Sequence, residues 1–135
     1  MDSSSFQEKR VSTIQTTNAP QAIGPYSQGK IFGSLLFTSG QIALDHQGND
    51  HTQANIEEQT HLAIKNLKSV LQAGGSDLQY VIKTTIFLKD MDDFQKVNQI
   101  YTTYFTEQKP ARSTVAVKTL PKNAGIEIEA IAFIP

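Results

Sequence analysis

The residue types that could do chemistry gather in the last third of the chain. The sequence has two arginines, and Arg10 lies in a polar leader, so Arg112 is the guanidinium of the expected folded body. Arg112 opens a strand-like run, and a second apolar run at residues 126–134 carries two glutamates. A fixed cation beside a carboxylate suits a small anion. We therefore predict a small-anion site where these two runs lie on adjacent strands.

The two glutamates, Glu127 and Glu129, should act as a pair. Alternate residues of a strand share a face, which sets the two carboxylates about 6.5–7 Å apart. On a largely apolar face, burial would disfavour charging both, and a nearby Arg112 would relieve one of them. The same residue types also fit a purely structural ion pair across two strands. The sequence leaves both interpretations open.

Three further positions could complete a pocket. At about 100° per residue, Asn98 borders the buried stripe of its helix, so its amide needs partners, either backbone groups or a ligand. Tyr26 sits in a short loop between Gly24-Pro25 and the following strand. Ser39 and Gly40 end another strand with a hydroxyl and a glycine, where a ligand can approach the backbone closely.

Composition excludes several other functions. The formal net charge is −1 with no block of like charges, which argues against a nucleic-acid or anionic-membrane surface. The absence of cysteine excludes disulfides, thiol nucleophiles and zinc–thiolate sites, and it suits a reducing compartment, so we expect the cytoplasm. His46 and His51 lie with two aspartates on one polar loop without supporting residues, so we expect no metal site.

The elements that must position these residues can be read from local pattern. The expected strands are residues 11–16, 30–32, 35–39, 81–88, 112–117 and 126–134, and the expected helices are residues 55–73 and 90–105. Gly33-Ser34 predicts a hairpin, and residues 121–125 should join the last two strands as a second one. Asn55 should cap the first helix, Gly74-Gly75 should end it, and Asp90 should cap the second.

This order predicts an α+β fold, with one mixed sheet of about six strands and two helices on one face. Residues 1–10 should form a flexible tail and residues 11–135 a single domain. The last strand is apolar on both faces, so a lone subunit would expose a large apolar patch. We therefore expect an oligomer.

Several short motifs, found in order between about residues 13 and 133, together resemble the Rid family, the reactive intermediate deaminases, and within it the RidA subgroup. They are Ile23-Gly24-Pro25-Tyr26, Thr38-Ser39-Gly40-Gln41-Ile42, Val81-Ile82-Lys83-Thr84-Thr85, residues 94–98 with Tyr101, Pro110-Ala111-Arg112-Ser113, Leu120-Pro121-Lys122 and Ile126-Glu127-Ile128-Glu129-Ala130.

The resemblance implies a chorismate-mutase-like subunit, a homotrimer with a central β-barrel, and clefts between neighbouring subunits. It implies a deaminase that needs no cofactor and hydrolyses 2-iminobutanoate, 2-iminopropanoate and related enamine acids, released by pyridoxal-phosphate enzymes, to 2-oxo acids and ammonia. The implied partners are these small acids and further copies of the chain.

The resemblance also assigns roles to individual residues. Arg112 takes the position of the carboxylate-binding arginine and Glu127 that of the glutamate that positions water. The remaining implied substrate-binding residues are Tyr26, Ser39, Gly40, Asn98 and Thr114. Many members carry a cysteine where Thr114 stands, and the connection at residues 106–109 is shorter than in many members.

Two other functions fit the same family. One is an endoribonuclease or translation inhibitor, which a single folded-body arginine and a near-neutral charge disfavour. The other is a non-catalytic ligand-binding trimer that uses the same cleft.

Overall fold

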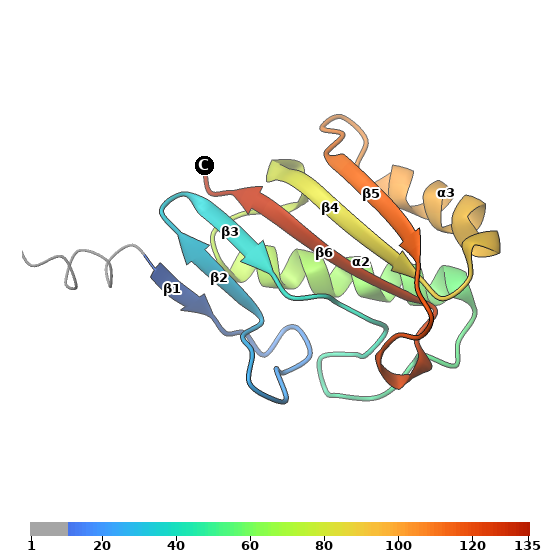
Figure 1. The fold of residues 1–135 in the computed structure, drawn as a ribbon. Helices are drawn as coiled ribbons and strands as arrows, with labels where there is room; N and C mark the ends of the chain where they lie inside the picture. Colours follow the sequence, from blue (N-terminus) through green and yellow to red (C-terminus); the bar gives the residue numbers. More distant parts are fainter. Residues whose placement is uncertain (1–10) are drawn as a thin grey trace, which may run out of the picture.

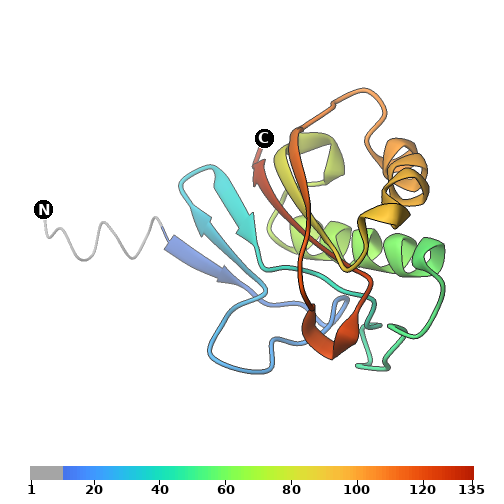
Figure 2. The ribbon, with the colours of Figure 1, turned by 45° about the vertical axis from the view of Figure 1, so that its right-hand side comes forward.

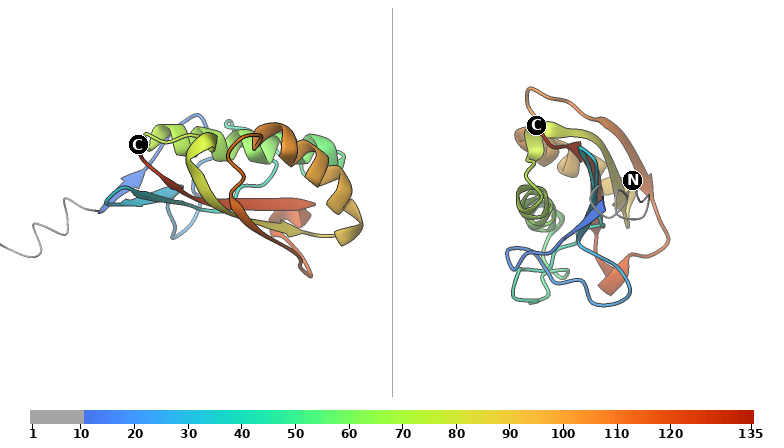
Figure 3. Two further views of the ribbon diagram at one scale, coloured as in Figure 1. Left: turned by 90° about the horizontal axis from the view of Figure 1, so that it is seen from above. Right: turned by 90° about the vertical axis from the view of Figure 1, so that its left-hand side faces the viewer.

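A computed structural model describes residues 11–135, and the predicted tail at residues 1–10 lies outside the described part. Six strands form one mixed sheet in the order β1-β2-β3-β6-β4-β5, and helices α2 (Ile56–Ala73) and α3 (Phe94–Tyr104) cover one of its faces (Figures 1 and 3). The strands are β1 (Val11–Ile14), β2 (Gly29–Phe32), β3 (Leu35–Thr38), β4 (Val81–Leu88), β5 (Ala111–Ala116) and β6 (Ile126–Phe133). The predicted sheet with two helices on one face is confirmed.

The strand order corrects one prediction, because the last two strands do not form a hairpin. β4 lies between them, antiparallel to β6 and parallel to β5. Helix α3 crosses over from β4 to β5, and the chain then turns through the short helix η3 (Pro121–Asn123) to enter β6 on the other side of β4 (Figure 2). A tight hairpin needs only two to about five linking residues, whereas residues 117–125 are long enough to pass β4.

The hydrophobic core lies between the sheet and α2. Side chains on the helix-covered face of β4 and β6 alternate with exposed or half-buried ones, as the two-residue period of a strand requires. The fully buried large side chains are Leu36, Ile64, Leu67, Val70, Leu71, Thr84, Ile86, Leu88, Val97, Ile126 and Ile128, together with Thr60. These contacts fix β6, and with it the position of the glutamates.

Both ends of α2 follow the predicted local signals. The Asn55 side chain accepts a hydrogen bond from the Glu58 N–H at 2.8 Å, which caps the helix N-terminus. Gly74 follows the last helical residue, and Gly75 takes a left-handed conformation with φ of 87°. The predicted cap and stop of this helix are confirmed.

The second predicted helix is divided in two. Asp90 caps a single 3-10 turn, η2 (Met91–Asp93), by accepting a hydrogen bond from the Asp92 N–H, and α3 itself starts only at Phe94. The predicted start at Asp90 was therefore early, since the aspartate caps the turn that leads into the helix.

The face of the sheet away from the helices carries exposed apolar side chains. No element within residues 11–135 covers this open face (Figure 3). By strand register and burial its exposed members are Val11, Phe32, Leu35, Phe37, Val115 and Phe133. The second apolar face inferred from the sequence is thus present. Within the described residues, neither helix is long and apolar enough to cross a bilayer.

Candidate active site

Arg112 lies on the edge strand β5, on the face that α3 covers. It stands opposite Thr84 in the parallel pairing of β4 and β5, and its Nη1 donates a hydrogen bond of 2.7 Å to Asn98 Oδ1. The guanidinium carbon lies 4.8 Å from the centre of the Tyr101 ring and 5.6 Å from that of Phe94. Two aromatic faces and one amide therefore hold the cation in a fixed orientation.

Most of the Arg112 donors remain available. A guanidinium has five N–H groups, and the Asn98 bond is the one that Arg112 makes within residues 11–135. A cavity of about 390 Å³ opens beside it, lined by Asn98, Tyr101, Thr102, Phe105, Lys109, Pro110 and Arg112. The partner of the Asn98 amide oxygen is thus a side chain of the predicted site and not a backbone group.

Tyr101 and Thr114 complete this cluster. Burial raises the pKa of Tyr101 above its ordinary value, although the hydrogen bond with Thr84 and the charge of Arg112 oppose the rise, so the phenol stays neutral. Thr114 follows Arg112 by two residues and points to the same side of β5. Its Oγ1 is buried and has no hydrogen-bond partner among the described residues. We call Arg112, Asn98 and Thr114 the arginine half-site.

Glu127 lies elsewhere, on the open face of β6 opposite Phe87. Its carboxylate packs so closely on the Gly40 backbone that a Cβ atom there would lie 2.6 Å from Oε2. Glu127 lines a cavity of about 310 Å³ with Pro20, Gln21, Ile23, Tyr26, Gln28, Gly40, Gln41, Ile42, Leu44, Pro121 and Lys122. We call Tyr26, Gly40 and Glu127 the glutamate half-site.

Burial makes the Glu127 carboxylate harder to ionise. Burial raises the pKa of Glu127 above its ordinary value, and the neighbouring charge of Glu129 raises it further. This is the effect that the sequence predicts for two carboxylates on one face of a strand. The relief expected from Arg112 is absent within the chain.

Ser39 holds the loop that carries Tyr26. Pairing of β3 with β6 ends at Phe37 with Ile131 and resumes at Gln41 with Ile128, so residues 38–40 oppose only the two residues 129–130 of β6 and form a bulge. The Ser39 Oγ donates a hydrogen bond to the Ser27 carbonyl, and its N–H donates to the Gln28 carbonyl at 2.9 Å. The Tyr26 hydroxyl accepts a hydrogen bond from the Ile23 N–H at 3.3 Å.

The chain does not bring Arg112 and Glu127 together. They stand on opposite faces of the sheet with β4 between their strands, and they line different cavities. The predicted placement on adjacent strands was therefore wrong, and so was the alternative of a structural ion pair, since neither residue forms an ion pair within residues 11–135. One chain holds two separate half-sites.

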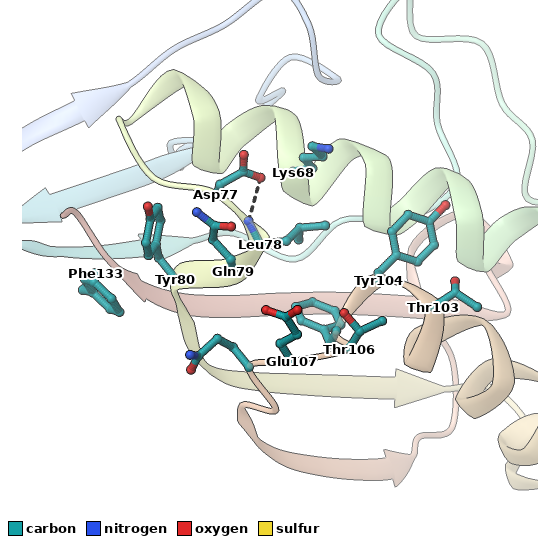
Figure 4. Close-up of a pocket in the computed structure, with 12 residues that line it drawn as sticks. Lys68, Asp77, Leu78, Gln79, Tyr80, Thr103, Tyr104, Thr106, Glu107 and Phe133 are labelled. Atoms are coloured by element: carbon teal, nitrogen blue, oxygen red, sulfur yellow. Dashed lines mark hydrogen bonds between the residues drawn. The ribbon is translucent and has the colours of Figure 1, made fainter.

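The remaining candidates lie away from both half-sites. His51 pairs with Asp45 at 3.0 Å on the predicted polar loop, and the described residues contain no cluster of three or more metal-type ligands. A further cavity, of about 560 Å³, lies between α2, the turn that leads into β4 and the end of α3 (Figure 4). Residues 106–108 line it, whereas Lys109 lines the Arg112 cavity, so the short connection separates the two spaces.

Sequence reasoning missed the part of Tyr101 in holding the arginine. The helical pattern explained Tyr101 as a buried core residue, which it is, at 7% exposure. Its ring also stacks beneath the Arg112 guanidinium. The signal that could have revealed this was the presence of Tyr101 and Asn98 one turn apart in the same motif.

Comparison with known proteins gives consistent relatives. The family model described as "Endoribonuclease L-PSP" matches residues 16–134. A Mus musculus 2-iminobutanoate/2-iminopropanoate deaminase is 45% identical over 119 residues, covering 88% of each chain. The structure of YyfA of Yersinia pestis, titled as a Rid family protein, is 45% identical with a TM-score of 0.89, covering 92% of this chain and 99% of YyfA. E. coli TdcF with bound serine is 42% identical with a TM-score of 0.86, covering 90% of this chain and 98% of TdcF.

Proposed function

Because the chain belongs to the Rid family, we propose that it hydrolyses small 2-imino and enamine acids, such as 2-iminobutanoate and 2-iminopropanoate, to 2-oxo acids and ammonia. The identity to the mouse deaminase supports this substrate class. The observation that carries the proposal is the pair of half-sites. One presents a guanidinium with most of its donors available beside a cavity, and the other presents a half-buried carboxylate in a cavity.

The proposed active unit is a homotrimer in which three sheets pack their open faces into a central barrel. An exposed apolar face of this extent calls for a cover, and further copies of the chain would supply it. The separation of Arg112 from Glu127 gives a second reason for assembly. In the proposed trimer the arginine half-site of one protomer faces the glutamate half-site of the next.

Arg112 is proposed to bind the substrate carboxylate. Its planar fork of donors matches a carboxylate in a two-bond arrangement that a lysine cannot reproduce. Asn98 and the Tyr101 ring already fix the guanidinium, so little freedom is lost when the ligand binds. The unpartnered Thr114 hydroxyl lies on the same side and is proposed to bond the same ligand.

Glu127 is proposed to act on water. As the water oxygen bonds to the carbon of the protonated C=N group, the C=N π electrons pass to nitrogen, the carboxylate takes one proton from the water and a neutral carbinolamine forms. Glu127 returns that proton to the nitrogen, which becomes an ammonium group. It then takes the hydroxyl proton as the C–N bond breaks, which releases ammonia and leaves the 2-oxo acid, and this last proton passes to the ammonia, which restores the carboxylate. The raised pKa of Glu127 makes its carboxylate a better proton acceptor than an exposed glutamate.

The other residues of the glutamate half-site are proposed to shape the pocket. Gly40 leaves room for the Glu127 carboxylate, which an added Cβ would displace. Tyr26 borders the ligand from its loop. Ser39 keeps that loop in place and can still accept a hydrogen bond. These steps use only side chains and water, and we place the reaction in the cytoplasm, where the donor enzymes would release the imines.

The proposal is tested with a coupled assay. A threonine dehydratase generates 2-iminobutanoate, and 2-oxobutanoate release is followed under conditions where spontaneous hydrolysis is slow. Wild type should accelerate release, and Arg112→Lys should fold normally but lose most of the acceleration, because an ammonium lacks the fork. Arg10→Lys, at the other arginine of the sequence, should behave as wild type. Acceleration of wild-type size by Arg112→Lys would remove Arg112 from the mechanism.

The description of the family model keeps ribonuclease activity as the alternative. A net charge of −1 supplies little affinity for phosphates. Incubating the purified protein with RNA across a range of salt concentrations tests this directly, and cleavage that copurifies with the trimer would favour the alternative. Binding of the imine products without turnover would instead indicate a non-catalytic ligand-binding trimer.

A further inference from the structure

Three glutamines are almost completely buried. Gln28 is 4% exposed, Gln59 is 5% exposed and Gln41 is 6% exposed. A buried amide that lacks partners costs folding free energy, so buried glutamines are nearly always hydrogen-bonded. Comparing the hydrogen bonds of the three amides therefore separates those that stabilise the fold from one that does not.

The side-chain amides of Gln28 and Gln59 stabilise the fold through hydrogen bonds to the backbone. The Gln28 Oε1 accepts a hydrogen bond from the Thr16 N–H at 2.7 Å, and its Nε2 donates to the Pro20 carbonyl at 2.8 Å. The Gln59 Nε2 donates to the Ala54 carbonyl at 2.8 Å, and its Oε1 accepts from the Gly125 N–H at 2.9 Å. Both ends of each amide are used.

Gln41 is different. Its backbone N–H and C=O are both paired with Ile128, at 2.8 and 3.0 Å, but its side-chain amide bonds to none of residues 11–135. Gln41 lines the same cavity as Glu127. The residue is nearly buried, yet its amide has no partner among residues 11–135 and is not closed off from solvent, as expected for a side chain in the wall of that cavity.

The neighbourhood of Gln41 indicates what its amide would meet. Gly40, the preceding residue, packs on the Glu127 carboxylate, and consecutive residues of an extended chain point to opposite sides. Gln41 and Glu127 thus reach the cavity from different sides and would contact different groups of one ligand. An amide both donates and accepts, which suits a small acid with a carboxylate or carbonyl oxygen beside an N–H group.

We propose that Gln41 is a further ligand-binding residue, whose side-chain amide hydrogen-bonds the polar groups of a small 2-imino or 2-oxo acid in the Glu127 cavity. The choice of ligand class rests on the proposed deaminase function. The observation that the Gln41 amide is unpaired within residues 11–135 does not depend on it.

The test uses Gln41→Met, which keeps the length of the side chain and removes its polar atoms. Gln28→Met is the matched control, because it removes an equally buried amide that is fully bonded. Melting temperatures are measured at equal protein concentration, and affinity for 2-oxobutanoate, a stable product, is measured by calorimetry. Gln41→Glu serves as a second variant if Gln41→Met fails to fold, since its charge should repel the acid.

Gln41→Met should melt at or above the wild-type temperature and bind 2-oxobutanoate about tenfold more weakly, as the loss of one or two neutral hydrogen bonds would give. Gln28→Met should melt at a lower temperature. A fall in the melting temperature of Gln41→Met equal to that of Gln28→Met, or unchanged affinity, would overturn the inference. So would wild-type protein that binds no 2-oxobutanoate. Wild type that binds the product but hydrolyses no imine would refute the deaminase proposal alone.

Discussion

Replacing Gly40 by alanine would push the Glu127 carboxylate out of place while leaving the fold intact. The added Cβ would lie 2.6 Å from Oε2, and ordinary contact begins at 3.4 Å, so the oxygen must retreat by about 0.8 Å. Gly40 does not have a left-handed φ, and the three nearest atoms, the Glu127 Oε2, Cδ and Cγ at 2.6–2.8 Å, all belong to one side chain, so Glu127 rather than the backbone must move. A misplacement of this size should lower kcat by roughly 30- to 100-fold.

The coupled deaminase assay gives kcat and KM for Gly40→Ala, and thermal unfolding gives its stability. Gly74→Ala is the steric control, because its Cβ would lie 2.5 Å from Leu36 and 2.7 Å from Ile14 in the core. Gly74→Ala should melt at a lower temperature and keep the wild-type kcat, whereas Gly40→Ala should show the reverse. A folded Gly40→Ala protein with the wild-type kcat and KM would refute the reasoning that the position of Glu127 limits the reaction.

Three further predictions concern the half-sites and the open face. Burial raises the pKa of Glu127, so its ionisation costs stability as the pH rises above the unfolded value of about 4.3, and the cost is complete above the folded pKa. Glu127→Gln should therefore abolish turnover and raise the melting temperature at pH 7, and the rise should vanish below about pH 4.3. An equal rise at both pH values would contradict this. Thr114→Val removes a hydroxyl that has no partner within residues 11–135, so the melting temperature should stay the same or rise while kcat/KM falls several-fold. An unchanged kcat/KM would exclude a contact between Thr114 and the ligand. Phe37→Glu places a charge on the open face and should turn the proposed trimer into an inactive monomer, as measured by light scattering. A variant that stays a stable trimer would exclude this face from the interface.

Local sequence signals predicted much of the fold. Gly33-Ser34 produced the β2–β3 hairpin, and Asn55 and Gly74 marked the ends of α2, because turns and caps depend on a few neighbouring residues. The raised pKa of Glu127 also followed from the sequence, since the apolar strand face indicates burial, its first cause, and the two-residue period of a strand places Glu129 on the same face.

Long-range pairing could not be predicted in the same way. The patterns of β5 and β6 fit a hairpin as well as they fit two strands on either side of β4, because strand alternation does not encode the neighbour. The error carried over to Arg112 and Glu127, which were placed on adjacent strands. That the Gln41 amide has no hydrogen-bond partner within residues 11–135 was likewise unpredictable, since this depends on packing from several segments.

The most direct test of the central account is a mixed trimer. Arg112→Lys and Glu127→Gln chains with different tags are co-expressed in equal amounts, and assemblies carrying both tags are assayed for imine hydrolysis. If each active site joins the arginine half-site of one protomer to the glutamate half-site of the next, every trimer that contains both chains keeps one cleft of its three, about one third, intact. The account therefore predicts that the mixture recovers about that fraction of wild-type turnover although each parent is inactive. Mixed trimers no more active than their parents would contradict it.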